Sequence, residues 1–138
     1  MRPPSTVNIC AVIQPDSGAA KNAMALGTGL PGNAFYAATK AEVAILTKRF
    51  AMELGPHAIT VNAVAPGFVR TDLTRGGRGA PDWQATEQRF AGKTMMARIG
   101  EPDDIANAIA FLAAPDSGWI TAQMLTVDGG RMDYIGHG

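Results

Sequence analysis

Cysteine and histidine are scarce in this sequence, and neither sign of charge dominates. The single Cys10 excludes an internal disulfide and fits a reducing compartment. The two histidines, His57 and His137, are not clustered with each other or with Cys10, so these side chains do not indicate a metal site. Basic and acidic residues number 12 each, and no long basic run occurs, which argues against a nucleic-acid partner.

Long apolar runs are also missing. The N-terminal stretch MRPPSTVNICAVIQPDSG has one early arginine and a short apolar run that polar residues soon follow. We therefore expect no signal peptide, no transmembrane segment and a cytoplasmic location. The chain has 138 residues, 46% of them apolar and 17% charged, which is typical of one globular domain with one core.

Short apolar segments alternate with longer amphipathic ones. Strands are predicted over 7–13, 59–65 and 124–127. The first two segments are apolar on both faces, as in the buried strands of a parallel sheet. Glycine-rich stretches at 27–32 and 76–79 predict loops. The alternation predicts an α/β fold.

Helices are predicted over 36–54, 82–91 and 102–112. The longest has no internal Gly or Pro, and one of its faces carries Val43, Leu46, Phe50 and Leu54. The last helix begins at a proline, has two aspartates in its first turn, where the helix dipole favours them, and has an apolar inner stripe. This stripe consists of Ile105, Ile109 and Leu112.

Tyr36 and Lys40 stand four residues apart at the start of the long helix. This spacing places both side chains on one helix face, about 5–6 Å apart at Cβ. A phenol ordinarily titrates near pH ~10, and a fixed ammonium nearby favours the phenolate and lowers that pKa. The pair can therefore act as an acid/base unit. The alternative is a surface tyrosine that packs on the lysine stem.

Many motifs resemble, in order, those of the short-chain dehydrogenase/reductase family. The stretch GLPGNAFYAATKAEVAILTKRFAMELGPHAITVNAVAPGFVRTDL is similar to the central signature of that family, and RIGEPDDIANAIAFLAAPDSGWITAQMLTVDGG is similar to its tail. The resemblance is greatest to the type that includes 3-oxoacyl-acyl-carrier-protein reductases and glucose dehydrogenases. It implies the C-terminal part of a Rossmann-like, doubly wound parallel sheet, with three strands and flanking helices in one partial domain over 1–138.

The resemblance also implies an oxidoreductase that transfers hydride between NADP or NAD and a small carbonyl or alcohol. Tyr36 would donate or accept the proton. Lys40 would lower the pKa of the tyrosine and hold the nicotinamide ribose. In relatives the final helix and tail contribute to subunit contacts, so we expect a homodimer or homotetramer, with the Tyr36 helix packed against its copy.

The turn PGFVRT after the second strand is expected to flank the nicotinamide. By resemblance, Pro66 and Gly67 line the ring, Val69 offers backbone hydrogen bonds to the carboxamide, and Thr71 contacts the amide or a phosphate. From the residues alone, the segment is equally a simple strand-to-helix turn. The motif Asp128-Gly129-Gly130 predicts a tight turn after the last strand.

Residues 72–97 resemble a substrate lid with glycines that allow movement. Its larger apolar residues could cover an apolar substrate or could be ordinary packing residues; they are Trp83, Phe90, Met95 and Met96. Arg75 and Arg78 could meet an anionic group or could simply be solvated.

Two departures from the family pattern lead to an alternative hypothesis. No glycine-rich phosphate-binding turn follows a first strand, so we expect the dinucleotide-binding half to be absent. In the family a serine hydroxyl polarises the substrate oxygen. That serine position falls on Ala11 when the strand is aligned and on Ala23 when the distance from Tyr36 is kept, in a divergent segment over 1–25. Ser17 and Thr28 are the nearest hydroxyl residues. The alternative is a truncated, inactive fragment or pseudoenzyme that retains the oligomerisation and substrate-side elements.

Overall fold

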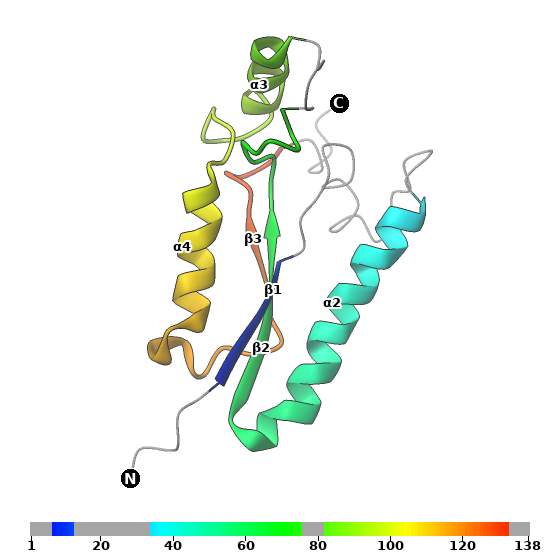
Figure 1. Ribbon diagram of the computed structural model, residues 1–138, viewed down its shortest axis with the longest axis vertical. Coiled ribbons are helices and arrows are strands. Elements are labelled where there is room, and N and C mark those ends of the chain that lie inside the picture. Colours follow the sequence, from blue (N-terminus) through cyan, green and yellow to red (C-terminus); the bar gives the residue numbers. More distant parts are fainter. Residues whose placement is uncertain (1–6, 13–33, 76–81, 133–138) are drawn as a thin grey trace.

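A three-stranded parallel sheet with a helix on either side organises the chain (Figure 1). The computed structural model describes residues 7–12, 34–75 and 82–132. The strands are β1 (Val7–Val12), β2 (Ile59–Pro66) and β3 (Met124–Val127), in the order β1-β2-β3. The α-helices are α2 (Ala34–Leu54), α3 (Trp83–Ala91) and α4 (Pro102–Ala113), and short 3-10 turns are η1 (Gly55–His57) and η2 (Pro115–Ser117).

The predicted α/β architecture is confirmed for the described residues. Each predicted strand and helix occurs, and the observed ends differ from the predicted ends by at most two residues. The glycine-rich stretches at 27–32 and 76–79 lie outside the described residues. No helix in the described ranges is both long and apolar enough to cross a membrane.

Strand β2 occupies the centre of the sheet because it has a neighbour on each side. Val7 of β1 pairs with Ile59, and Met124 of β3 pairs with Ala63. All residues of β2 after Ile59 are buried, as the apolar run predicts. Asn62 is buried with them; its side-chain amide donates to Ile120 O at 2.8 Å, and its Oδ1 accepts from the Gln123 amide at 3.1 Å. These bonds satisfy a polar group in the core.

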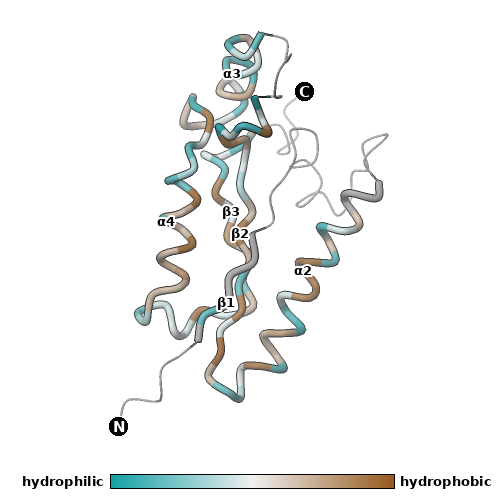
Figure 2. Tube along the Cα trace, viewed as in Figure 1, coloured by the Kyte–Doolittle hydropathy of each residue, from teal (hydrophilic) through white to brown (hydrophobic). Residues whose placement is uncertain are grey.

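Helix α4 packs against one side of the sheet through the predicted stripe. Ile105 and Leu112 are buried with Val64 and Val69, and Ile109 packs against this cluster. Apolar positions accordingly follow the strands and the side of α4 that faces them (Figure 2). The helix begins at Pro102, and the Glu101 amide donates to the Asp104 carboxylate at 2.8 Å. Proline at the first position and an acidic cap explain why the helix starts here.

Helix α2 lies on the opposite side of the sheet and contacts β2 (Figure 1). Its buried residues in the described part are Thr47 and Ala51. The Thr47 hydroxyl donates to Val43 O at 2.8 Å, so a polar side chain is tolerated against the sheet. Of the apolar face seen in the sequence, Leu46 and Phe50 are exposed, so that face points largely away from the sheet.

Candidate functional site

The carboxyl ends of β2 and β3 and the N-terminal ends of α2 and α4 lie at the same end of the molecule (Figure 1). In parallel α/β sheets, ligands bind outside the carboxyl ends of the strands. The Gly67 amide, directly after β2, donates to Val127 O, the last carbonyl of β3, at 2.9 Å. The two strand ends are thus joined, and the sequence-predicted turn Pro66–Thr71 begins at this junction.

Gly67 is in close contact with the turn after β3. A Cβ atom at this position would lie 2.7 Å from Asp128 Cα, so no larger residue fits without a backbone shift. The predicted tight turn is confirmed: Gly129 and Gly130 have φ of 67° and 70°, and the Gly130 amide donates to Asp128 Oδ1 at 3.0 Å. The two glycine-containing turns therefore pack directly against each other.

Val69 pairs with Gly100 in an isolated parallel bridge. The Gly100 amide donates to Phe68 O at 2.9 Å, and the Arg70 amide donates to Gly100 O at 2.8 Å. Because Gly100 bonds to the residues on either side of Val69, the N–H and C=O of Val69 itself point away from Gly100. The Val69 carbonyl accordingly accepts from Thr74 Oγ1, at 2.7 Å. The Val69 N–H faces the same side, as a backbone contact to a ligand amide requires.

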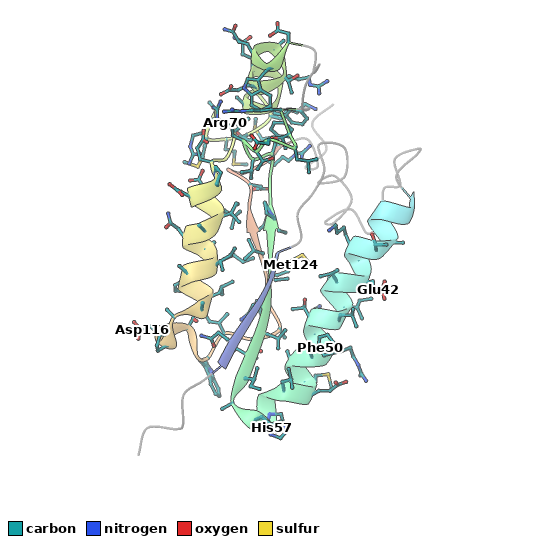
Figure 3. All side chains as sticks on the ribbon, in the orientation of Figure 1. Glu42, Phe50, His57, Arg70, Asp116 and Met124 are labelled. Atoms are coloured by element: carbon teal, nitrogen blue, oxygen red, sulfur yellow. The ribbon has the colours of Figure 1, made fainter. Side chains whose placement is uncertain are left out.

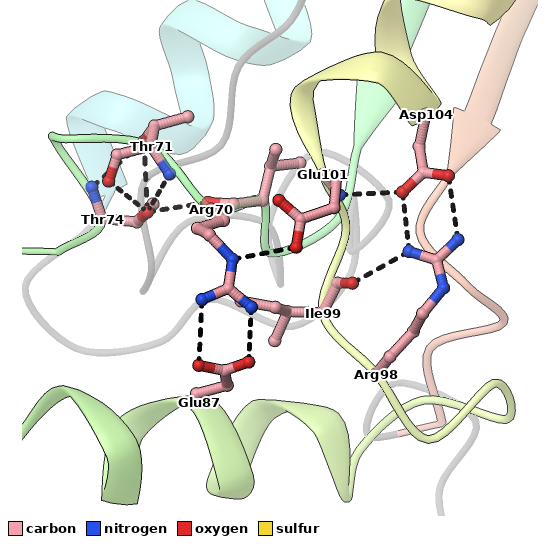
Figure 4. A network of polar contacts seen from close by, with 9 residues as sticks. Arg70, Thr71, Thr74, Glu87, Arg98, Ile99, Glu101 and Asp104 are labelled. Carbon is pink, nitrogen blue, oxygen red and sulfur yellow. Dashed lines mark hydrogen bonds and ion pairs between the residues drawn. The ribbon is translucent and has the colours of Figure 1, made fainter.

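Thr71 caps the turn that follows. The Thr74 amide donates to Thr71 Oγ1 at 3.1 Å, and the Thr71 amide donates to Thr74 Oγ1 at 2.8 Å. This reciprocal pattern is a capping box with threonine in place of the usual acid or amide. The Thr-x-x-Thr spacing in the sequence was the signal that could have revealed it. The turn is pre-organised, and the Thr71 hydroxyl is part of its frame (Figure 4).

A small hollow of about 90 Å³ opens beside the joined strand ends. Two predicted cofactor residues, Gly67 and Val69, line it, whereas Lys40, Pro66 and Thr71 do not. Its other lining residues are Phe68, Met96, Arg98, Gly100, Asp104, Val127, Asp128 and Gly129. Three of the residues that line the hollow are charged: Arg98, Asp104 and Asp128.

Tyr36 is the third residue of α2, and Lys40 follows one turn later. Because α2 begins at the carboxyl end of the sheet, both positions belong to the end of the molecule that holds the Pro66–Thr71 turn (Figure 1). The Lys40 side chain is half-buried and makes a contact within the protein. The side chain of Tyr36 lies outside the described part.

Apolar residues of α3 cover the turn. The rings of Phe68 and Phe90 are stacked, with centroids 3.9 Å apart and planes at 2°, and Trp83 stacks on Phe68 at 6.2 Å. Phe90 is buried and is thus a packing residue, one of the two alternatives that the sequence left open. Met95 and Met96 are instead exposed, by 65% and 61%, and remain available to a ligand.

Ion pairs that the sequence did not predict surround the turn (Figure 4). Arg70 donates to both carboxylate oxygens of Glu87 on α3, at 2.6 and 3.2 Å, and to Glu101 before α4, at 2.8 Å. These hydrogen bonds, first the one to Glu87 and then the one to Glu101, raise the pKa of Arg70. Figure 3 places Arg70 at the carboxyl end of the sheet and His57 at the opposite end. No sequence period links residues 70, 87 and 101, so pattern analysis could not find them.

Arg98 and Asp104 form a second two-bond ion pair, in which two guanidinium nitrogens lie 2.7 and 2.8 Å from the two carboxylate oxygens. Hydrogen bonds from Arg98, and next the Glu101 amide, lower the pKa of Asp104 from 3.8 to about 2. Both groups line the hollow. They fix the start of α4 beside the Val69–Gly100 bridge.

Several sequence-predicted positions lie outside the described residues. Ser17, Ala23, Thr28 and Arg78 are among them. Ala11, the other candidate for the serine position, lies in β1 in register with Ala63. Among the side chains that the structure describes, no three His, Cys, Asp or Glu residues gather as a metal site would require.

Comparison with known proteins places the chain in a family. A family model described as enoyl-(acyl carrier protein) reductase matches residues 15–132. The 3-oxoacyl-[acyl-carrier-protein] reductase FabG of Rickettsia bellii is 45% identical over 107 residues, and the short-chain reductase protein NovJ of Streptomyces niveus is 41% identical over 105. This chain belongs to the short-chain dehydrogenase/reductase family. The predicted resemblance to the 3-oxoacyl-acyl-carrier-protein reductase type is confirmed.

Solved structures of short-chain dehydrogenases/reductases share the fold. A family member from Serratia marcescens superposes with a TM-score of 0.69 at 34% identity, covering 89% of this chain and 44% of its own. A blue fluorescent protein from a metagenomic library, solved in complex with NADPH, gives 0.68 at 31% identity, with the same two coverages. The alignments with FabG and NovJ cover 76% and 75% of this chain, and 42% and 40% of those proteins. The chain therefore spans about two-fifths of these curated relatives.

Proposed function

We propose that this chain takes part in NADP- or NAD-dependent hydride transfer between a nicotinamide and a small carbonyl or alcohol. The observation that carries the proposal is the placement of the first turns of α2, with Tyr36 and Lys40, and of the Pro66–Thr71 turn at one end of the sheet. The family membership supports the reaction class. A 3-oxoacyl thioester is the substrate class that the similarity to FabG favours.

The residues at this end of the sheet fit a nicotinamide. The Val69 N–H faces away from Gly100, on the side where a carboxamide oxygen could accept it, and the Thr71–Thr74 capping box holds this backbone in place. Pro66 and Gly67 would line the ring. A relative of the same fold has been solved in complex with NADPH, and NADPH bound here would supply the hydride. Tyr36 would give its proton to the substrate oxygen, and the ammonium of Lys40 would favour the phenolate that remains.

Segment 72–97 would cover the substrate. Its described part packs on the turn through Phe90 and Trp83 and leaves Met95 and Met96 exposed near the hollow. Flexible thioether side chains suit an apolar substrate of variable shape.

We also propose that the exposed apolar face of α2 mediates a homodimer or homotetramer and that the protein works in the cytoplasm.

Cofactor titration tests the proposal. Nicotinamide fluorescence of NADPH and NADH should change saturably on addition of the protein. Tyr36→Phe should abolish most reduction of a 3-oxoacyl thioester while leaving binding of the dinucleotide intact, and Lys40→Met should weaken both. Glu42→Gln, on the exposed side of the same helix, is the control and should change neither.

Absence of saturable binding at millimolar dinucleotide would overturn the proposal for this chain. That result would favour the alternative hypothesis, in which the chain retains the substrate-side elements without activity. Binding without reduction by the unmodified chain would separate the two roles, because Val69 and Thr71 serve the cofactor whereas Tyr36 serves the chemistry.

A further inference from the structure

Arg70 connects three elements at the end of the sheet. It follows Val69 and precedes Thr71, and its side chain is 28% exposed. Its guanidinium reaches Glu87 in the middle of α3 and Glu101 at the start of α4. It also lies 5.8 Å from the centroid of the Trp83 ring. The same side chain thus joins Glu87 and Glu101 within the polar network in Figure 4.

Helix α3 also contacts the turn through aromatic rings and Ala91. Phe68 stacks on Phe90 and Trp83. Stacking keeps the ring planes parallel, but apolar burial is otherwise non-directional, so the stacked rings hold α3 near the turn and still tolerate sliding within the ring plane. A two-bond fork between guanidinium and carboxylate has a defined geometry and adds direction to the contact. The Arg70–Glu87 pair therefore gives α3 a defined position on the turn, which the ring stack alone does not.

We propose that Arg70 is a positioning residue that fixes the register of α3 on the Val69–Thr71 turn. Through the pair with Glu87, the helix that covers the substrate side and the backbone that faces the nicotinamide are held as one unit. The purpose of this coupling rests on the proposed function, whereas the docking of α3 does not. The role is distinct from chemistry, since Arg70 needs no contact with the reacting atoms.

Tryptophan fluorescence can isolate α3. The chain has two tryptophans, and Trp119 is 99% exposed, so Trp119→Phe leaves Trp83 of α3 as the single reporter at little structural cost. Trp83 is half-buried against Phe68, and acrylamide quenching will rise when α3 shifts from the turn. Substitutions are best made at the acidic partners, because Arg70 itself contacts the Trp83 ring.

Glu87→Gln and Glu101→Gln form a matched pair in this background. Each removes one carboxylate partner of Arg70, but only Glu87 belongs to α3. We expect Glu87→Gln to raise the quenching constant of Trp83 by about two- to fivefold, the range that an exposed ion pair allows. Glu101→Gln should leave it unchanged. Equal effects of the two variants, or no effect of Glu87→Gln, would overturn the proposal.

Arg70→Lys provides a second check, because lysine retains a cation for the Trp83 ring but cannot form the two-bond fork with Glu87. It should raise quenching as Glu87→Gln does, and a lysine variant identical to the parent would contradict a geometric role. Far-ultraviolet circular dichroism should show the same helix content in all variants, so that loss of fold is not read as loss of docking.

A kinetic arm links docking to the proposed reaction. With NADPH and a 3-oxoacyl thioester, Glu87→Gln should raise the KM of the thioester by about the same two- to fivefold, with a smaller change in kcat. A fall in kcat alone would contradict a positioning role. If the parent protein shows no turnover, the proposed function fails for this chain, and the Trp83 measurement still decides the role of Arg70.

Discussion

Gly67 leaves no room for a side chain between the two turns of the candidate site. Gly67→Ala would place Cβ 2.7 Å from Asp128 Cα and 2.8 Å from Asp128 Cβ. Relief of this overlap requires the strand ends to separate, so we expect a loss of about 1–3 kcal/mol in the free energy of unfolding. Urea denaturation measures it. Gly55→Ala is the matched control, because a Cβ there meets nothing within 4 Å, and equal losses at both positions would contradict the packing argument.

Asp104 makes the stability of the folded state depend on pH in the acid range. Hydrogen bonds from Arg98 lower its pKa in the folded state to about 2, below the ordinary 3.8. The ionised carboxylate therefore stabilises the folded state above the ordinary pKa, and this contribution is lost as the pH falls towards about 2. We expect the urea midpoint of the parent to fall more steeply across this window than that of Asp104→Asn. Parallel acid profiles would show that the Arg98 pair does not contribute.

The residues of the candidate site were predictable to different degrees. Tyr36, Lys40 and the Pro66–Thr71 turn stand in a fixed sequence order that resembles a family signature, and the structure places all of them at one end of the sheet. Glu87 and Arg98 gave no such signal, because ion pairs between loops and helices have no sequence period. Contacts of this kind depend on how the elements pack.

Among the elements, α3 is the shortest of the three α-helices in the described ranges and depends on its cap. Asp82 accepts hydrogen bonds from the amides of Gln84 and Ala85, at 3.0 and 3.3 Å. Asp82→Ala should therefore cost about 1 kcal/mol of helix stability. Faster hydrogen exchange of the α3 amides would report it. Asp82→Asn retains the cap and should exchange like the parent, whereas unchanged exchange in the alanine variant would show that packing on Phe68 alone maintains the helix.

The helices also show where amphipathic patterns succeed and where they do not. In α4 the apolar stripe predicted the buried side correctly, because only one side of that helix is apolar. In α2 apolar residues occur on more than one side, and the side against the sheet carries Thr47 and Ala51. Small residues allow a helix to approach a sheet closely, and a period of large apolar residues cannot reveal them. Strand β2 was predictable because it is buried on both faces and its sequence is an apolar run.

For the whole molecule, the exposed apolar face of α2 predicts self-association. Phe50 is 48% exposed, and Leu46, one turn earlier on the same side of α2, is 40% exposed. Phe50→Lys should convert a dimer or tetramer into smaller species in sedimentation velocity, because a charge would be buried in the interface. Phe111→Lys is the matched control, since Phe111 of α4 is 52% exposed. A parent that sediments as a monomer would contradict the prediction, and so would equal effects of the two lysines.

The register of the sheet has a consequence for how the chain folds. Val7 pairs with Ile59, 52 positions later, and Ala63 pairs with Met124, 61 positions later. In the described sheet no strand pairs with a neighbour that a short hairpin could deliver, so long loops must close before any ladder bond forms. Folding should be slow, as high contact order requires. Before β1 and β3 have paired with it, β2 is an apolar segment with two open edges. The partially folded chain is therefore the species most prone to aggregate during synthesis.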